Sequence, residues 1–316
     1  MAVTVFCACS WVAPPLGCAT SVPFTTGFFG NVQQYRIRPN DTLIELARKF
    51  DLGFNEIADA NPGIDPFIPK PGTVITIPSA WILPSPPRRP VILINLPEFR
   101  LYYFPKSKSQ RIFTFPLGIG DEGKDTPVGS YRVVEKIRRP AWHVPVSIRS
   151  QVRGLPKVVP PGPDNPLGSH ALRLSLRSVL IHGTNRPWGI GRRSSHGCLR
   201  LYPEDIVRLF NLVPIGMRVI VVNDPVKVAG WGDRVFVEAH RYEHRQIRMG
   251  KLIRLLADRK LIRRTDFSKL LRAVEEKKGY PIDVTLRLPP RTQQQREREV
   301  PLRGGALALP RSPGPP

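Results

Sequence analysis

Cysteine is scarce in this 316-residue chain, and its placement argues against a fold stapled by disulfides. Three of the four cysteines lie within the first 18 residues, so Cys198 is the only cysteine in the rest of the chain. A lone thiol cannot form an intramolecular disulfide, and structural zinc sites usually take two or more cysteines. The isolation of Cys198 therefore favours a chemical role for its thiol.

Long apolar runs are also lacking. The most apolar stretch, residues 2–19, is too short and too interrupted by Pro14-Pro15 to span a membrane. It is similar to the hydrophobic part of an export signal, so we expect a protein of the periplasm or cell envelope. Leu16-Gly17-Cys18 resembles the end of a bacterial lipoprotein signal, which makes Cys18 a candidate for lipid attachment, with simple secretion as the alternative.

Acidic residues are few, with 25 Asp and Glu against 48 Lys and Arg, and the formal charge is +23. Such a charge favours an anionic partner, although a merely solvated basic surface is the alternative. Helix-spaced leucines and basic residues predict a basic helical extension at 224–288 that meets an anionic wall polymer or membrane surface. Nucleic acid is not expected, because the predicted export places the chain outside the cytoplasm. Residues 289–316 are predicted to be disordered.

A small α/β unit is predicted at residues 34–79, after the signal and spacer of residues 1–33. Thr42 and Glu45 have the form of a capping box, and Asn55 is placed to cap a second short helix. With a strand at each end, the predicted order is strand, helix, helix, strand. The Pro-rich segment 80–90 is then a semi-rigid linker.

This unit resembles the LysM domain. The resemblance is carried by residues 35–43 (YRIRPNDTL), by Asn61-Pro62, and by residues 68–78 (IPKPGTVITIP). It implies binding to a glycan that contains N-acetylglucosamine, such as the glycan strands of peptidoglycan. A small α/β unit without a ligand is the alternative.

Residues 91–223 read as a mainly β domain, a sandwich or barrel. Short apolar strands alternate with Gly- and Pro-rich turns, and one short helix is expected after Tyr202. The fold class is therefore an α+β multidomain protein: a small βααβ unit, a sandwich-like β domain and a basic helical extension.

The segment 181–201 concentrates reactive groups, namely His182, His196 and Cys198. Zinc is one interpretation, but no second cysteine is available, and His143 and His170 follow no ligand pattern. Nucleophilic catalysis fits better, because an imidazole can take the proton of a thiol. Backbone N–H groups around Gly197 and Cys198 could then form an oxyanion site. A buried structural cysteine in a Gly-rich turn is the remaining alternative.

Two motifs in this segment, residues 181–184 (IHGT) and 194–201 (SSHGCLRL), closely resemble the signature of the L,D-transpeptidase catalytic (YkuD-like) domain. Residues 117–120 (LGIG), 126–129 (TPVG) and 165–168 (NPLG) resemble other recurring turns of that family. The resemblance covers about residues 91–223 and implies a β-sandwich enzyme that acts on cell-wall peptides without a metal or organic cofactor.

By position, the resemblance implies that Cys198 is the nucleophile and His182 the proton donor and acceptor. The Gly183 carbonyl orients the imidazole, and the site is shaped by Ser195, His196 and Gly197. The implied substrate-contacting residues are Thr184, Trp188 and Arg200.

The implied reaction is a two-step acyl transfer. Cys198 attacks the L,D peptide bond of a tetrapeptide stem, D-alanine leaves, and an amine of a second stem takes the acyl group to give a 3→3 cross-link. Acylation of Cys198 by carbapenems is also implied. L,D-carboxypeptidase activity, D-amino-acid exchange and attachment of a lipoprotein to the wall are alternatives that use the same thioester, and a non-enzymatic wall anchor is a remote one.

Overall fold

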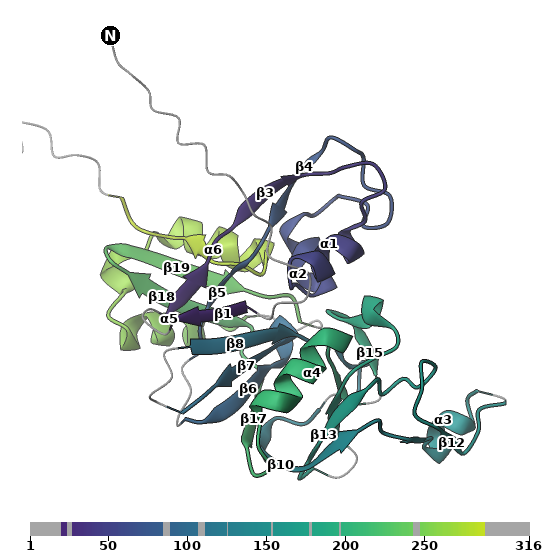
Figure 1. Ribbon diagram of the computed structural model, residues 1–316. Helices are drawn as coiled ribbons and strands as arrows, with labels where there is room; N and C mark the ends of the chain where they lie inside the picture. The colour runs from purple at the N-terminus through teal and green to yellow at the C-terminus, as the bar shows by residue number, and fades with distance from the viewer. Residues whose placement is uncertain are drawn as a thin grey trace, which may run out of the picture. The chain divides into compact units, whose positions relative to one another are not determined.

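The structure is a computed structural model (Figure 1). It describes residues 20–23, 27–84, 89–106, 111–124, 126–152, 154–176, 179–195, 197–242 and 247–287. The predictions for the export signal, for Cys18 and for the tail at 289–316 lie outside the described residues. Among the described residues, no helix combines the length and apolarity that a membrane span requires.

The LysM-like unit has the predicted order of elements. Strand β3 (Gln33–Arg36) pairs antiparallel with β4 (Val74–Ile77), and helices α1 (Leu43–Lys49) and α2 (Phe54–Ala60) lie between them in sequence. The Thr42 hydroxyl accepts the Glu45 N–H, as the capping box predicts. The cap that we assigned to Asn55 is wrong: Gly53 is the N-cap of α2, and its N–H donates to the Glu56 carboxylate at 2.7 Å.

A nine-stranded mixed sheet forms the centre of the second unit, and it confirms the mainly β prediction. The strand order is β1-β8-β7-β6-β17-β10-β13-β14-β16. The strands are β1 (Thr20–Pro23), β6 (Val91–Asn95), β7 (Arg100–Phe104), β8 (Arg111–Pro116), β10 (Gly129–Arg138), β13 (His170–Leu174), β14 (Leu180–His182), β16 (Leu199–Arg200) and β17 (Arg218–Val222). The helix expected after Tyr202 is α4 (Pro203–Leu212).

Strands β6 and β7 of this sheet are buried on both faces. In β6, Ile92 and Ile94 point into a core that includes α4, whereas Val91 and Leu93 point into a second core that contains LysM-like residues. Successive side chains of a strand alternate between faces, so a strand covered on both sides has no polar face. This explains the apolar run of β6 and shows that the LysM-like unit packs on the sheet.

A buried ion pair joins the LysM-like unit to the sheet. The Arg100 guanidinium on β7 lies 2.7 Å from the Glu56 carboxylate of α2, and both side chains are at most 2% exposed. Trp81 donates its indole N–H to the same carboxylate, and its ring lies under the guanidinium. The charges are therefore satisfied by several partners, as buried charges require.

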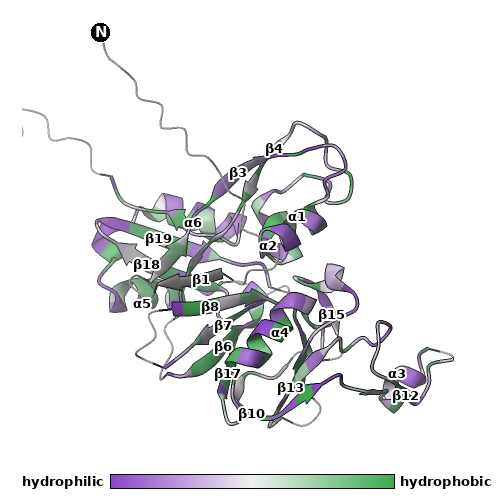
Figure 2. Ribbon diagram, viewed as in Figure 1, coloured by the Kyte–Doolittle hydropathy of each residue, from purple (hydrophilic) through white to green (hydrophobic). Residues whose placement is uncertain are grey.

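The C-terminal extension is not wholly helical, which corrects the prediction. Strands β18 (Val226–Trp231), β19 (Arg234–Ala239) and β20 (Ile282–Asp283) form a sheet that packs with α5 (Met249–Asp258) and α6 (Phe267–Glu276). The reason is visible in the strand sequences VKVAGW and RVFVEA, where valines two residues apart face one core. Figure 2 shows the mixture of apolar and polar residues along these strands and helices.

A second buried charge cluster ties this extension to the nine-stranded sheet. The Lys227 ammonium lies 3.0 Å from the Glu98 carboxylate and 2.8 Å from the Glu238 carboxylate. Glu98, Glu238 and His240 have the spacing of metal ligands. Because the Lys227 ammonium already lies among these side chains, it balances the charge of the two buried carboxylates in an ion-pair network.

The remaining elements are short. They are β2 (Phe28–Gly30), β5 (Ala80–Ile82), β9 (Ile119–Gly120), β11 (Trp142–His143), β12 (Val158–Val159), β15 (Arg193–Ser195), α3 (Val146–Arg149), η1 (Leu96–Glu98), η2 (Pro187–Gly189) and η3 (Ile262–Arg264).

Candidate active site

Strand register brings His182 beside the short strand that directly follows Cys198. β14 and β16 are parallel, with Ile181 opposite Leu199 and His182 opposite Arg200. Ile181 and Leu199 are fully buried in the core beneath the sheet. Alternation therefore turns His182 and Arg200 to the other face, and Cys198 directly precedes the first residue of β16. Fifteen residues lie between His182 and Cys198 in the chain, and the pairing of β14 with β16 brings the two segments side by side.

The imidazole of His182 is held in one tautomer. Its Nδ1 lies 2.6 Å from the Gly183 carbonyl oxygen, which can only accept, so Nδ1 carries the proton and Nε2 is a proton acceptor. The side chain is buried. Burial, helped by the positive charge of Arg200, lowers the pKa of His182 to about 4. The imidazole is therefore neutral near pH 7.

The thiol of Cys198 is protonated in the same range. Burial raises its pKa, while the Leu180 backbone and the Arg200 charge oppose that rise. A neutral thiol beside a neutral imidazole differs from a preformed thiolate–imidazolium pair. The arrangement suits a base that takes the thiol proton during attack.

Two side chains fix the turn before the cysteine. Ser195 donates its hydroxyl to the Cys198 carbonyl at 2.6 Å, and Thr126 donates to the Gly197 carbonyl at 2.8 Å. Gly197 has φ +102°, which confirms that the chain turns there. Thr126 was not predicted as a site residue, although its sequence TPVG was a recognisable turn.

A second buried loop supports the strand of His182. The Asn165 side chain is fully buried and donates to the Pro140 carbonyl. Gly168 has φ +68°, and a Cβ there would lie 2.7 Å from the Thr184 nitrogen. The predicted turn at 165–168 therefore lets its backbone pack directly against the chain that follows His182.

The predicted substrate-contacting residues differ in their exposure to solvent and in their hydrogen bonds. Arg200 lies opposite His182 in the strand register, and its Nη1 donates to the Ser194 hydroxyl. Thr184 is buried, and its hydroxyl accepts the Arg186 N–H within a turn. Trp188 is 55% exposed on η2. His196 lies outside the described residues. Among those described, His182 and Cys198 form no metal-ligand group with a third residue.

The sequence matches two families. Residues 35–78 match the LysM domain, and residues 89–221 match the L,D-transpeptidase catalytic domain (YkuD). The probable L,D-transpeptidase YcfS of Escherichia coli (strain K12) is 36% identical over 293 residues, which cover 87% of this chain and 88% of YcfS. The probable L,D-transpeptidase YbiS of the same strain is 43% identical over 201 residues, which cover 62% of this chain and 65% of YbiS. The chain therefore belongs to the L,D-transpeptidase family, with a LysM domain ahead of the catalytic domain.

Proposed function

We propose that this L,D-transpeptidase uses Cys198 as its nucleophile and His182 as its base. The observation that supports the proposal is the β14–β16 register: a buried imidazole with a fixed tautomer lies opposite Arg200, two residues after the only cysteine beyond residue 18. Nε2 takes the thiol proton while Sγ bonds to the carbonyl carbon of the L,D bond of a tetrapeptide stem. The C–N bond then breaks, and D-alanine leaves with the proton.

In the second half of the reaction, an amine is the nucleophile and the Cys198 thiolate is the leaving group. The thioester is attacked by an amine of a second stem, His182 removes the proton of that amine, and the thiol is restored as a 3→3 cross-link forms. Backbone N–H groups at Gly197 and Cys198 are the proposed oxyanion donors. Arg200 is the proposed ligand of a substrate carboxylate, and Ser195, His196 and Gly197 shape the turn. Thr184 and Trp188 are also proposed to contact the substrate.

Replacing His182 by glutamine tests the choice of base. Loss of a general base typically slows the step about 10²-fold or more. We expect that loss in the rate of carbapenem acylation, followed by intact-protein mass spectrometry. The matched control is His143→Gln, since His143 is an exposed histidine of the same domain. A His196→Gln variant that lost more activity than His182→Gln would move the base to His196.

The pH profile of acylation tests the protonation states. A base with a pKa of about 4 is neutral above that pH, so the rate should rise through pH 4 and stay level from about 5 to 8. An unperturbed histidine would instead give an inflection near 6.5. Because Arg200 contributes to the lowered pKa, Arg200→Met should move the inflection upward. A wild-type profile centred on 6.5 would contradict the neutral pair.

The acceptor decides which reaction the thioester completes. Water gives a carboxypeptidase, a D-amino acid gives exchange, and a lysine of a lipoprotein gives attachment to the wall. Mass spectrometry of the products, with water, D-amino acid and peptide amine offered together, separates these outcomes from the 3→3 dimer. A wall anchor without activity would give none of them.

We also propose that the LysM domain binds the glycan strands of peptidoglycan, and that the protein is exported, with Cys18 as a candidate lipid anchor.

The basic C-terminal extension, residues 224–288, is proposed to contact an anionic wall polymer or membrane. Its α5–α6 segment carries exposed basic residues that support this, among them Lys251, Arg254, Lys260 and Arg263. Salt-dependent sedimentation with isolated sacculi, with and without residues 224–316, tests the contact.

A further inference from the structure

The first turn of LysM helix α2 is bonded to the segment that joins the two proposed catalytic residues. The Phe54 N–H donates to the Ile190 carbonyl at 3.1 Å, and the Asn55 N–H donates to the Gly191 carbonyl at 3.2 Å. The first N–H groups of a helix have no partner within the helix and usually bond to caps or water. Here two of them bond to the segment between His182 and Cys198.

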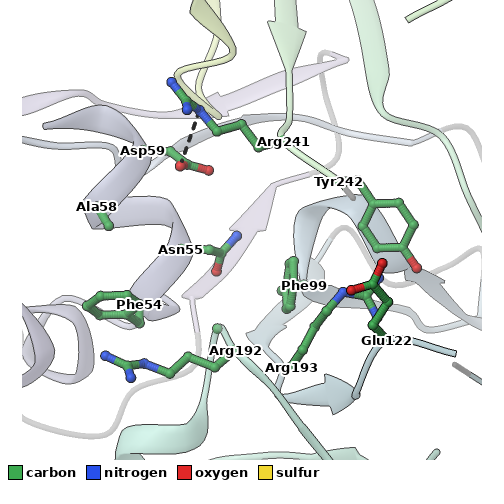
Figure 3. Close-up of a pocket in the computed structure, with 11 residues that line it drawn as sticks. Phe54, Asn55, Ala58, Asp59, Phe99, Glu122, Arg192, Arg193, Arg241 and Tyr242 are labelled. Atoms are coloured by element: carbon green, nitrogen blue, oxygen red, sulfur yellow. Dashed lines mark ion pairs between the residues drawn. The ribbon is translucent and has the colours of Figure 1, made fainter. Parts of the chain in front are cut away.

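Gly191 is the residue that permits this contact. Its φ is +77°, and a Cβ at this position would lie 2.1 Å from the Phe54 nitrogen. No side chain fits at that distance, so the two backbones approach as closely as glycine allows. The next residue adds a cation–π contact, with the Arg192 guanidinium 3.8 Å from the centre of the Phe54 ring. Figure 3 shows the two side chains lying alongside each other.

A second set of LysM contacts lies on the other side of Cys198 in sequence. The Tyr202 hydroxyl donates to the Leu52 carbonyl at 3.0 Å, and Tyr202 is buried. Glu204 receives two hydrogen bonds from the Arg48 guanidinium, at 2.9 and 2.8 Å. The nucleophile segment is therefore held by the LysM domain at residues 190–192 before it and at 202–204 after it.

Short-range bonds connect the first of these contacts to the cysteine. Strand β15 begins directly after Arg192 and pairs with β9, and the last residue of β15, Ser195, donates to the Cys198 carbonyl. The cavity in Figure 3 lies between α2, residues 191–193 and Arg241–Tyr242, and neither His182 nor Cys198 lines it. Helix α2 thus lines one side of this cavity. Residues 191–193, which precede the turn at Gly197 and Cys198, line another side.

We propose that the LysM domain is a positioning element of the active site: helix α2, through Gly191, holds the segment that carries Cys198 in its reactive geometry. The inference rests on the proposed role of Cys198. It means that the LysM domain does more than bind glycan, because its packing affects the reactivity of Cys198 in the other domain. Phe54, Asn55 and Gly191 are positioning residues, since they act through the chain that precedes Cys198.

The test compares two glycine substitutions. Gly191→Ala introduces a Cβ into the contact with α2, whereas Gly216→Ala introduces one at φ +86° with no atom within 4 Å. Both positions have a similar positive φ, but only the Cβ at 191 meets the LysM helix. Displacing a reacting group by about 1 Å can cost up to ~10²-fold, and we expect at least a tenfold fall in the maximal rate of carbapenem acylation for Gly191→Ala. We expect Gly216→Ala to react at the wild-type rate.

Three further measurements separate positioning from general damage. The half-saturating carbapenem concentration and the binding of chito-oligosaccharide to the LysM domain should be unchanged in Gly191→Ala, so that only the maximal rate falls. If Gly191→Ala does not fold, Tyr202→Phe decides, because it removes only the hydroxyl bond to Leu52; a fall of about threefold or more supports the inference. Equal maximal rates in wild type, Gly191→Ala and Tyr202→Phe would overturn it. Failure of wild type to be acylated at Cys198 would instead overturn the proposed function.

Discussion

Cys198→Ala should abolish turnover of tetrapeptide stems, with a loss of at least ~10³-fold, because Cys198 is the only cysteine among the residues that the structure describes. The turn that carries the residue is fixed by bonds from Ser195 and Thr126 to backbone carbonyls, which alanine at 198 leaves in place. The fold should therefore survive the substitution, and the loss should be chemical. The measurement is release of D-alanine and formation of cross-linked dimer from purified tetrapeptide muropeptides.

The control for this variant is its own stability and glycan binding. Cys198→Ala should melt within a few degrees of wild type and should bind chito-oligosaccharide equally well. Dimer formation at the wild-type rate would show that another residue is the nucleophile. Loss of both activity and melting transition would show only that the residue is structural, and Cys198→Ser would then be used to repeat the measurement.

Arg100→Ala should have the largest effect on stability. The guanidinium donates to Glu56, to the Thr114 hydroxyl and to the Asp51 carbonyl, and its face lies 4.2 Å from the Trp81 ring centre. Removing it leaves the Glu56 carboxylate buried without a counter-ion, and breaking a buried pair in this way costs about 3–5 kcal/mol. Urea unfolding, followed by tryptophan fluorescence, should show that fall in the free energy of unfolding.

The matched control is an exposed ion pair on the same sheet. Arg173 and Glu135 are 2.6 Å apart, but their side chains are 44% and 52% exposed. Arg173→Ala should cost less than about 1 kcal/mol, because water screens the pair. The double variant Glu56→Gln/Arg100→Met should recover part of the loss, since it leaves no unpaired charge. If Arg100→Ala and Arg173→Ala cost the same, the LysM domain is not anchored by the buried pair.

The parts of the protein that are defined by local pattern could be predicted. The capping box of Thr42 and Glu45 and the motifs around His182 and Cys198 occupy short stretches, so their spacing is visible in the sequence. The cap of the second LysM helix was wrongly assigned to Asn55, two residues after the true cap, Gly53. The short helix after Tyr202 was predicted for the same reason, because Pro203 and the first-turn acids mark its beginning.

The parts that depend on distant contacts could not be predicted. Glu56 reads as an exposed helical acid until Arg100, 44 residues later, is found beside it. Gly191 reads as one glycine among several in a loop, and only the structure places Phe54 against it. The strands β18 and β19 were missed for a different reason: their alternating valines are a local pattern, but the helix-spaced leucines that follow them were taken to indicate helix for the whole extension.

The most direct test of the central claim is to trap the acyl-enzyme. Wild-type protein is mixed with a purified disaccharide tetrapeptide, quenched in acid after short times, digested and analysed by mass spectrometry. The proposed mechanism predicts that the peptide containing Cys198 carries the disaccharide tripeptide as a thioester, and that D-alanine appears in equal amount during the first turnover. Release of D-alanine without an adduct on that peptide, or with the adduct on another residue, would contradict the claim.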